Sequence, residues 1–261
     1  MSRTAFLWTL ITLAAAAPAF PQALPEPELG NQLVNLPTHL ALAPSTMQVI
    51  FTHRFVATVS SAGSGDLYGL DTGADVGLGL AMGFQHGLEA AVYRSSYLKQ
   101  YEASLKWTAL RQGDSVPLGA AIRAGAEYRA ASGMTDRWAG FAQLILARRL
   151  GSALDLFAVP MFVSDTPTLR DAWNAGFGAS LHLGRTVDLA AEAIPGNRDV
   201  TGAATAWAVG LTKRVRGHAF ILYLGNSRAT TTDLIAGSDI PGGFRSGDVR
   251  LGFNLIRRFP E

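Results

Sequence analysis

Residues 74–84 have the sequence Ala-Asp-Val-Gly-Leu-Gly-Leu-Ala-Met-Gly-Phe, which carries the clearest structural signal in the chain. The large apolar side chains occupy alternate positions: Val76, Leu78, Leu80, Met82 and Phe84. The positions between them hold aspartate, glycine or alanine. Because successive side chains of a strand point to opposite faces, this alternation predicts a β-strand with one apolar face and one face of small or polar residues.

The same alternation recurs along the rest of the chain. Four more segments show it clearly: 101–110, 118–129, 173–183 and 248–259. Weaker strands are predicted at 46–57, 88–95, 138–148, 154–163, 187–194, 204–213 and 218–225. Pro160 weakens the prediction for its segment because proline cannot donate to a strand ladder. The total is about twelve strands, within a range of roughly ten to fourteen, and single-chain outer-membrane barrels have even numbers.

The connections between the predicted strands alternate in length. Short turns fall near 85–87, 111–116, 149–152, 184–186 and 214–217. Longer loops span 58–73, 130–137, 164–172, 195–203 and 226–246, and the short link at 95–98 is the exception. This pattern predicts an all-β, antiparallel, up-and-down transmembrane barrel with short periplasmic turns and longer outer loops. Both chain ends would then lie in the periplasm.

Alternation alone does not decide whether the apolar face meets lipid or a soluble core, because an exported sandwich or lipocalin buries the same face inward. Two sets of residues favour lipid. Aromatic side chains on the apolar face cluster toward strand ends, as membrane interfaces favour: Phe84, Tyr101, Trp107, Tyr128, Trp138, Trp173, Trp207 and Phe259. The charges on that face, Arg148, Lys213 and Arg257, lie near the short turns, where a charge costs little. The opposite face is also rich in glycine, which an exposed soluble strand would rarely tolerate.

The N-terminus resembles a secretory signal peptide. Arg3 provides a positive charge, Ala5–Ala17 is an apolar stretch too short to span a membrane, and cleavage is expected after Ala19 or Ala23. The alternative is a buried N-terminal helix. We therefore expect a signal peptide over 1–23, an extended periplasmic segment over 24–45 and a barrel domain over 46–261, in the outer membrane of a diderm bacterium.

Several short motifs occur in order along the mature chain. They are Asn35-Leu36-Pro37-Thr38, His53-Arg54-Phe55, Asp66-Leu67-Tyr68-Gly69-Leu70-Asp71, Arg94-Ser95, Gly217-His218-Ala219-Phe220 with Asn226-Ser227, and Gly247-Asp248-Val249-Arg250-Leu251-Gly252-Phe253-Asn254. On these motifs the chain resembles a family of bacterial outer-membrane β-barrel proteins that is defined only as a domain of unknown function. The resemblance implies an outer-membrane barrel and no particular activity. The last strand also resembles the signal recognised by the barrel-assembly machinery, although Phe259 is followed by Pro260 and Glu261.

The sequence contains little that points to catalysis or cofactor binding. There are 0 cysteines, so a metal site with cysteine ligands is excluded. The net charge of +2 does not indicate a basic surface for nucleic-acid binding. Nucleotide-binding, esterase and zinc-protease motifs are missing, and we expect no cofactor and no metal. Ser180 and His182 share a strand face with Asn174, which raises the alternative of a lipid hydrolase. His53 and Arg54 are adjacent in a strand and must point to opposite faces.

The inner face of the predicted barrel carries charges of both signs. Glu102, Lys106, Arg123, Glu127 and Arg129 are expected on one stretch of wall. The full set of lumen candidates is Glu102, Lys106, Arg123, Glu127, Arg129, Asn174, His182 and Arg250. Such a lining either tunes solute selectivity or forms ion pairs that fill a narrow barrel. The 226–246 loop, with Asp233 and Asp239, is interpreted as a surface loop or lid, with calcium binding as an alternative.

Two functions fit these features. The first is a passive pore for ions or small solutes. The second is a closed barrel that docks an unknown protein partner through its outer loops or residues 24–44. A lipid-active enzyme is a weaker alternative. The expected partners are outer-membrane lipids and, during biogenesis, the barrel-assembly machinery.

Overall fold

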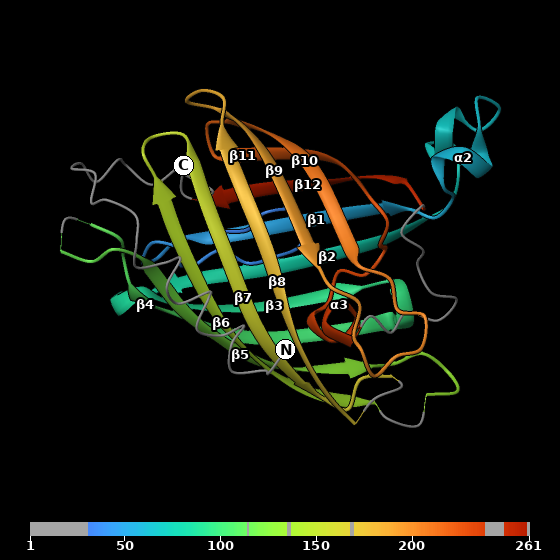
Figure 1. The fold of residues 1–261 in the computed structure, drawn as a ribbon, viewed down its shortest axis with the longest axis horizontal. Helices are drawn as coiled ribbons and strands as arrows, with labels where there is room; N and C mark the ends of the chain where they lie inside the picture. The colour runs from blue at the N-terminus through green and yellow to red at the C-terminus, as the bar shows by residue number, and fades with distance from the viewer. Residues whose placement is uncertain (1–30, 114, 135–136, 168–169, 238–247, 260–261) are drawn as a thin grey trace.

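The computed structural model describes residues 31–259 apart from 114, 135–136, 168–169 and 238–247, and these residues form a closed antiparallel barrel (Figure 1). The strands are β1 (Met47–Phe55), β2 (Ala74–Phe84), β3 (Leu88–Ser95), β4 (Gln100–Leu110), β5 (Gly119–Arg129), β6 (Trp138–Leu150), β7 (Leu154–Ser164), β8 (Asp171–His182), β9 (Val187–Ile194), β10 (Ala206–Val215), β11 (His218–Gly225) and β12 (Arg250–Phe259). Short helices are α2 (Val59–Ala62), η1 (Leu67–Gly69), η2 (Gln85–Gly87), η3 (Tyr97–Lys99) and α3 (Thr232–Gly237).

Each strand pairs with the strand that follows it in sequence, and β1 closes the barrel by pairing with β12. Met47 lies opposite Met82 of β2 on one side and opposite Phe259 of β12 on the other. The predicted up-and-down barrel is therefore confirmed. The clearest predicted strand, 74–84, has the same bounds in the structure, and Pro160 lies within β7.

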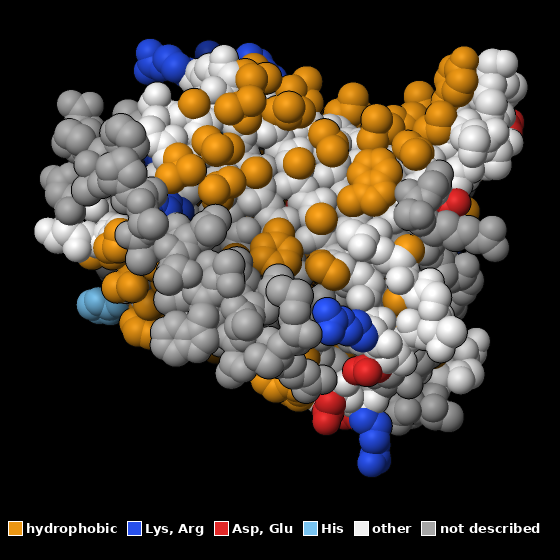
Figure 2. All heavy atoms as spheres, in the orientation of Figure 1, with side chains coloured by type: hydrophobic (Ala, Val, Ile, Leu, Met, Phe, Trp, Pro, Cys, Tyr) orange, Lys and Arg blue, Asp and Glu red, His pale blue; other side chains and the backbone are white. Residues whose placement is uncertain are grey.

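The outer side of the barrel wall is apolar, and its inner side carries most of the wall's charged side chains together with buried apolar ones from β6 and β7. In β4, buried and exposed residues alternate, and Leu105 is 65% exposed whereas Lys106 is 3% exposed. Hydrophobic side chains gather over the outer wall (Figure 2). A soluble protein has the reverse arrangement, so this wall is built to face lipid. Among the residues described, no helix is long and apolar enough to cross a membrane.

The two ends of the barrel differ in the length of their connections. The short-turn end holds η2 and the turn at Arg216 and Gly217, and both Met47 and Phe259 lie there. The long-loop end holds residues 56–73 and the segment between β11 and β12, and also the short η3 link. This alternation of short and long connections was predicted from the sequence. That the short-turn end faces the periplasm stays a prediction.

The aromatic side chains predicted for the membrane interfaces lie on the outer face. Six of them are exposed: Phe84, Tyr101, Trp107, Trp138, Trp173 and Phe259. Tyr128 and Trp207 are half-buried, and Tyr128 packs against Trp138 with ring centroids 4.9 Å apart. Their contact with lipid headgroups stays a prediction.

The N-terminal segment does not lie where the sequence predicted. An extended segment outside the barrel is wrong for residues 31–42, because Leu33, Val34, Leu36 and Leu42 are buried inside the lumen. Strand periodicity gave no reason to place this aperiodic, proline-containing segment within the fold. Burial of its apolar side chains away from water is nevertheless favourable, and the small residues of the inner wall leave room for them. The predicted signal peptide at 1–23 and residues 24–30 lie outside the described residues.

The loop between β11 and β12 is the second departure. A surface loop or lid was expected at 226–246, yet every residue of α3 within it is buried inside the barrel. Figure 1 shows α3 within the wall at the long-loop end. The loop lacks strand periodicity, so its insertion was not visible in the sequence. Asp239 lies outside the described residues.

We predict that the folded protein behaves as a closed barrel on a detergent gel. An unboiled sample should migrate differently from a boiled one, because the continuous ring of strands resists detergent until heated. The protein should also stay in the membrane fraction after washing with salt. Coincident bands together with extraction by salt alone would contradict a membrane barrel.

Candidate functional site

The lumen is lined by charged side chains from neighbouring strands. Glu102 lies opposite Glu127, and Lys106 lies opposite Arg123, across the β4–β5 pair. Gln100 lies opposite Arg129 in the same pair. The five charges that the sequence assigned to one stretch of wall are thus neighbours on two adjacent strands.

Two of the wall cations form ion pairs with wall carboxylates. Arg123 forms an ion pair with Glu102 and donates from Nη1 to Gln143 Oε1 at 2.9 Å. Lys106 Nζ lies 3.1 Å from Glu89 Oε1. Such pairing is expected inside a barrel, because a buried charge without a partner is strongly destabilising.

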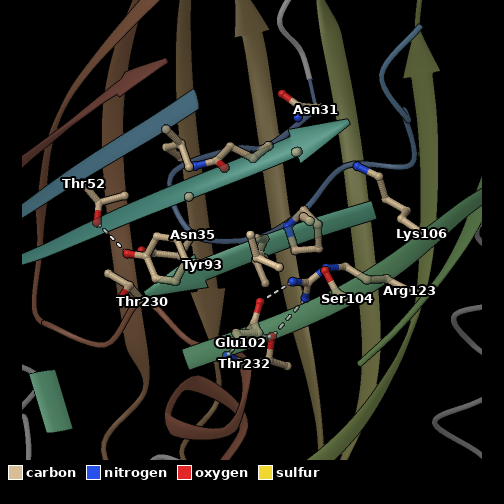
Figure 3. Close-up of a pocket in the computed structure, with 18 of the residues that line it drawn as sticks. Asn31, Asn35, Thr52, Tyr93, Glu102, Ser104, Lys106, Arg123, Thr230 and Thr232 are labelled. Atoms are coloured by element: carbon tan, nitrogen blue, oxygen red, sulfur yellow. Dashed lines mark hydrogen bonds and ion pairs between the residues drawn. The ribbon is translucent and has the colours of Figure 1, made fainter. Parts of the chain in front are cut away.

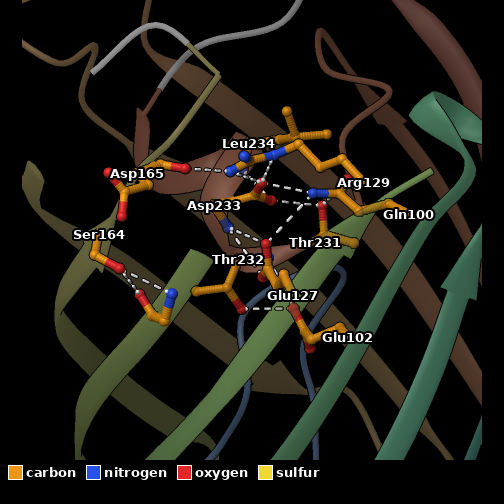
Figure 4. A network of polar contacts seen from close by, with 11 residues as sticks. Gln100, Glu102, Glu127, Arg129, Ser164, Asp165, Thr231, Thr232, Asp233 and Leu234 are labelled. Atoms are coloured by element: carbon orange, nitrogen blue, oxygen red, sulfur yellow. Dashed lines mark hydrogen bonds and ion pairs between the residues drawn. The ribbon is translucent and has the colours of Figure 1, made fainter. Parts of the chain in front are cut away.

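Helix α3 enters the lumen and is held by Asp233 (Figure 4). Arg129 donates from Nε to Asp233 Oδ2 at 2.9 Å, and both side chains are 0% exposed. Gln100 Nε2 and Thr231 Oγ1 also donate to the Asp233 carboxylate, at 2.5 and 2.9 Å. The ion pair is therefore enclosed by hydrogen bonds that satisfy its remaining lone pairs.

The wall carboxylates in turn receive the first N–H groups of α3. Thr232 donates its backbone N–H and its hydroxyl to Glu102 Oε2, each at 2.9 Å. The backbone N–H of Asp233 donates to Glu127 Oε1 at 3.1 Å. Because the first N–H groups of a helix have no partner within it, these carboxylates supply the missing acceptors.

The rest of the inserted loop is fastened at the long-loop end. Arg228 lies 3.1 Å from Asp75 and over the Tyr97 ring at 4.9 Å. Burial raises the pKa of the Tyr97 phenol above its usual range, although the neighbouring Arg228 acts in the opposite direction. Asn174 donates to the Ala236 carbonyl at 2.9 Å, and Arg250 donates to the Asn226 carbonyl at 3.2 Å. Asn174 and Arg250, predicted to line the lumen, thus anchor the loop at this end.

The N-terminal segment enters as a tight turn with Val34 and Asn35 at its tip. Thr38 N–H donates to the Asn31 carbonyl at 3.1 Å, and Leu33 N–H donates to the Leu36 carbonyl at 2.9 Å. These two bonds close the turn within the lumen. The segment is therefore a folded insert and not an extended strand.

Asn35 holds this insert to two wall charges. Its backbone N–H and its Nδ2 donate to the Glu192 carboxylate, at 3.0 and 2.5 Å. Its Oδ1 accepts from Arg54 Nη2 at 2.9 Å. Arg54 also donates to Asn254 Oδ1 at 2.6 Å, and Asn254 donates back to the Val34 carbonyl at 2.8 Å. Three sequence motifs that are far apart in the chain contact one another here, through Asn35, Arg54 and Asn254.

Glycines on the inner wall make room for the insert. A Cβ atom at Gly176 would lie 2.6 Å from Leu36 Cδ2, and one at Gly210 would lie 2.8 Å from Val34 Cγ2. A side chain at either position would force at least the Leu36 or Val34 side chain to move. Close contact with the inserted chain thus explains these two glycines, whereas others, such as Gly252 beside Tyr223, make room for side chains of the wall.

A cavity of about 130 Å³ with polar and apolar lining lies among the wall and the two inserts (Figure 3). Its polar lining includes Asn35 from one insert, Thr232 from the other, and Arg54, Glu102 and Arg123 from the wall. Since water occupies about 30 Å³ per molecule in the liquid, the cavity has room for a few waters or a small polar solute.

His182 belongs to a separate network near the short-turn end. Its Nδ1 lies 2.8 Å from Asp188 Oδ1 and its Nε2 lies 2.9 Å from Asp155 Oδ2. Arg149 donates to Asp155 at 2.6 and 2.7 Å, and Arg214 pairs with Asp188. His182 therefore bridges two carboxylates that each have their own arginine.

This geometry does not support the hydrolase alternative. Both ring nitrogens of His182 are engaged by carboxylates, which leaves neither to activate Ser180. Asn174 is eight positions from His182 on the same strand, which corresponds to about 26 Å. The described residues also contain no group of three or more His, Cys, Asp or Glu side chains suited to a metal.

Sequence reasoning missed several lumen residues. Asp188 and Glu192 alternate inward in β9, so the strand pattern could have revealed both. Arg54 is 2% exposed and His53 stacks outside on Phe253 at 4.9 Å, as the prediction of opposite faces requires. The contacts of Asn35 with Glu192 and Arg54 could not be predicted from the sequence, in which Asn35 is recognisable only as part of a motif.

Comparison with known proteins places this chain among membrane barrels. A family model described as "Membrane bound beta barrel domain (DUF5777)" matches residues 29–259. No curated protein matches the sequence. Among solved structures, the fold is similar to NanC porin, with a TM-score of 0.53 and 8% identity over 81% of this chain and 98% of that one.

Two further structures share the fold. An outer membrane channel from Pseudomonas putida has a TM-score of 0.51 and 14% identity over 85% of this chain and 98% of that one. An active-site mutant of outer membrane phospholipase A from Escherichia coli has a TM-score of 0.50 and 15% identity over 84% of this chain and 91% of that one. At these identities the similarity concerns the fold alone.

We predict that Gly176→Leu displaces the N-terminal insert. The new side chain would occupy the space of Leu36, and overpacking of this kind costs about 1–3 kcal/mol. A reporter cysteine at the buried position Leu40 should then react faster with a water-soluble maleimide, by roughly tenfold for each 1.4 kcal/mol. The chain has 0 cysteines, so the reporter is unique.

Gly140→Leu provides the matched control. A Cβ there would meet Ser164 Oγ at 3.5 Å, an ordinary contact, and position 140 alternates with the buried Ala139 and Phe141. Labelling at position 40 should be unchanged in this variant. Equal rates in the Gly176 variant and the parent would contradict the packing of the insert against β8.

Proposed function

Because the chain belongs to the family of membrane bound beta barrel domains, we propose that it is an outer-membrane channel for small polar solutes, held closed by its two inserts. The outer-membrane location is supported by the shared fold of porins and channels. The signal peptide and the periplasmic position of both chain ends remain part of this proposal.

The observation that carries the proposal is the contact between inserts and wall. Each insert contacts charged residues of the wall through a polar residue. Asp233 of α3 binds Arg129, and Asn35 of the N-terminal turn binds Glu192 and Arg54. A barrel that served only as a scaffold could fill its interior with apolar side chains at less cost. The charged part of the wall that these polar residues contact is suited to carrying water and solutes once the inserts move.

The chemistry of the wall indicates the class of solute. Acidic and basic side chains alternate around the cavity, as in the Glu89–Lys106 and Glu102–Arg123 pairs. Such a lining offers hydrogen bonds to many polar groups and does not strongly favour one sign of charge. We infer a passive route for small polar molecules or ions, without catalysis.

A permanently closed barrel is the second candidate function. It is favoured by the complete burial of the Arg129–Asp233 pair and by the apolar packing of Leu33 and Leu36 in the lumen. In that case the loops at the long-loop end, or residues 24–44, would dock a protein partner. Conductance measurements separate the two candidates.

We predict that releasing both inserts opens the channel. Asp233→Ala leaves Arg129 buried without its carboxylate, a loss that typically costs about 3–5 kcal/mol, and so favours withdrawal of α3. Gly176→Leu displaces the other insert. In a planar bilayer, the parent protein should be mostly silent, and the double variant should show frequent discrete openings.

Asp199→Ala removes an exposed carboxylate from another loop of the same end and should leave the conductance unchanged. A gel shift on heating would show that each variant is folded. A folded and incorporated double variant that stays silent would contradict the channel and leave the closed barrel.

Within the opened double variant, Arg123 should influence ion preference. Arg123→Glu replaces a cation beside the cavity with a second anion near Glu102, so the ratio of cation to anion permeability should rise. Reversal potentials under a salt gradient measure that ratio. An unchanged ratio would show that solutes do not pass this part of the wall.

A further inference from the structure

Residues 56–73 form a compact loop at the ends of β1 and β2, here called the lateral knob. Val56 N–H donates to the Gly73 carbonyl at 2.9 Å, which closes its neck. Helix α2 begins at a capping box in which Thr58 Oγ1 accepts the Ser61 N–H at 3.1 Å. The knob is thus a hydrogen-bonded loop whose two ends lie close together, as the ends of an Ω-loop do.

The lateral knob has no apolar core of its own. Loops of this kind normally pack their own side chains inward. Here Gly69 is the one buried residue among 56–73, all of which the structure describes. Leu67, Tyr68 and Leu70 are instead 58%, 54% and 48% exposed.

The backbone of the knob is held in an unfavourable conformation that displays these side chains. Leu67 and Tyr68 have φ angles of 48° and 57°, in the left-handed region that bulky residues rarely adopt. Tyr68 N–H donates to the Gly63 carbonyl at 2.6 Å, and Asp71 N–H donates to the Asp66 carbonyl at 3.2 Å. Strain kept in place by hydrogen bonds commonly marks a functional site.

The position of the knob points to the membrane. Figure 1 shows α2 standing off the side of the barrel, apart from α3 and the loops around it. Figure 2 shows hydrophobic side chains continuing from the outer wall toward the knob. In β2, which leaves the knob, Leu78 and Leu80 are 58% and 44% exposed on the lipid-facing wall.

We propose that the lateral knob is a membrane anchor. Leu67, Tyr68 and Leu70 insert at the boundary between headgroups and acyl chains of the leaflet at the long-loop end. A tyrosine suits this boundary because its ring is apolar and its hydroxyl is polar. Asp66 and Asp71 flank the apolar side chains, are exposed, and stay on the aqueous side. This inference rests on the membrane barrel and not on channel activity.

The test uses single cysteines in the full chain, which has 0 of its own. Tyr68→Cys carries an environment-sensitive fluorophore in the apolar group, and Ser64→Cys carries it at an exposed polar position of the same knob. Both proteins are placed in phosphatidylcholine vesicles with spin-labelled lipid or with aqueous iodide. A gel shift on heating shows that each labelled barrel is folded.

We expect spin-labelled lipid to quench the label at position 68 strongly and the label at position 64 weakly, with the order reversed for iodide. Equal exposure of both labels to iodide, without lipid quenching, would overturn the proposal. Self-quenching at position 68 that grows with protein density would also overturn it, and would assign the surface to a second copy of the chain.

Discussion

The structure depends on the closure of the sheet by β1 and β12. A lipid environment offers no hydrogen bonds to the backbone, so every N–H and C=O in the membrane must find a partner within the protein. The pairing of Met47 with both Met82 and Phe259 removes the two free edges that an open sheet would leave. Once the sheet is closed, one face of every strand contacts lipid, and the side chains of the other face must pack inside the barrel.

The inner face is packed in two ways: β6 and β7 contribute large apolar side chains such as Phe141, Ile145 and Met161, and elsewhere inserted chain fills the lumen. The wall supplies glycines at Gly176 and Gly210 where the insert passes closely, and charges where the insert presents polar groups. Wall charges and inserts are therefore mutually dependent: Arg129 needs Asp233, and Glu192 needs the N–H groups around Asn35. The barrel domain and the N-terminal segment form one structural unit.

The sequence predicted the part of this structure that repeats. Period-two alternation revealed the strands, because lipid imposes the same rule on each of them, and β2 has its predicted bounds. It also placed Glu102 and Arg123 on one stretch of wall. The inserts were not predicted, because Asn35 and Asp233 contact residues that are distant in sequence and have no periodic signal. The positive φ angles of Leu67 and Tyr68 were likewise invisible to pattern analysis.

The two inserts are held by different interactions, and this bears on how they can move. Asp233 and Arg129 form a buried ion pair, in which attraction largely offsets the loss of hydration, so the pair adds little net stability while both partners remain. Both inserts also pack apolar side chains into the lumen, Leu33 and Leu36 from the N-terminal turn and Leu234 and Ile235 from α3, and this packing is favourable on its own account. The inserts thus differ in their polar contacts: a buried ion pair holds α3, and hydrogen bonds from Asn35 to wall charges hold the N-terminal turn. In the proposed channel, both sets of contacts must break before the lumen opens.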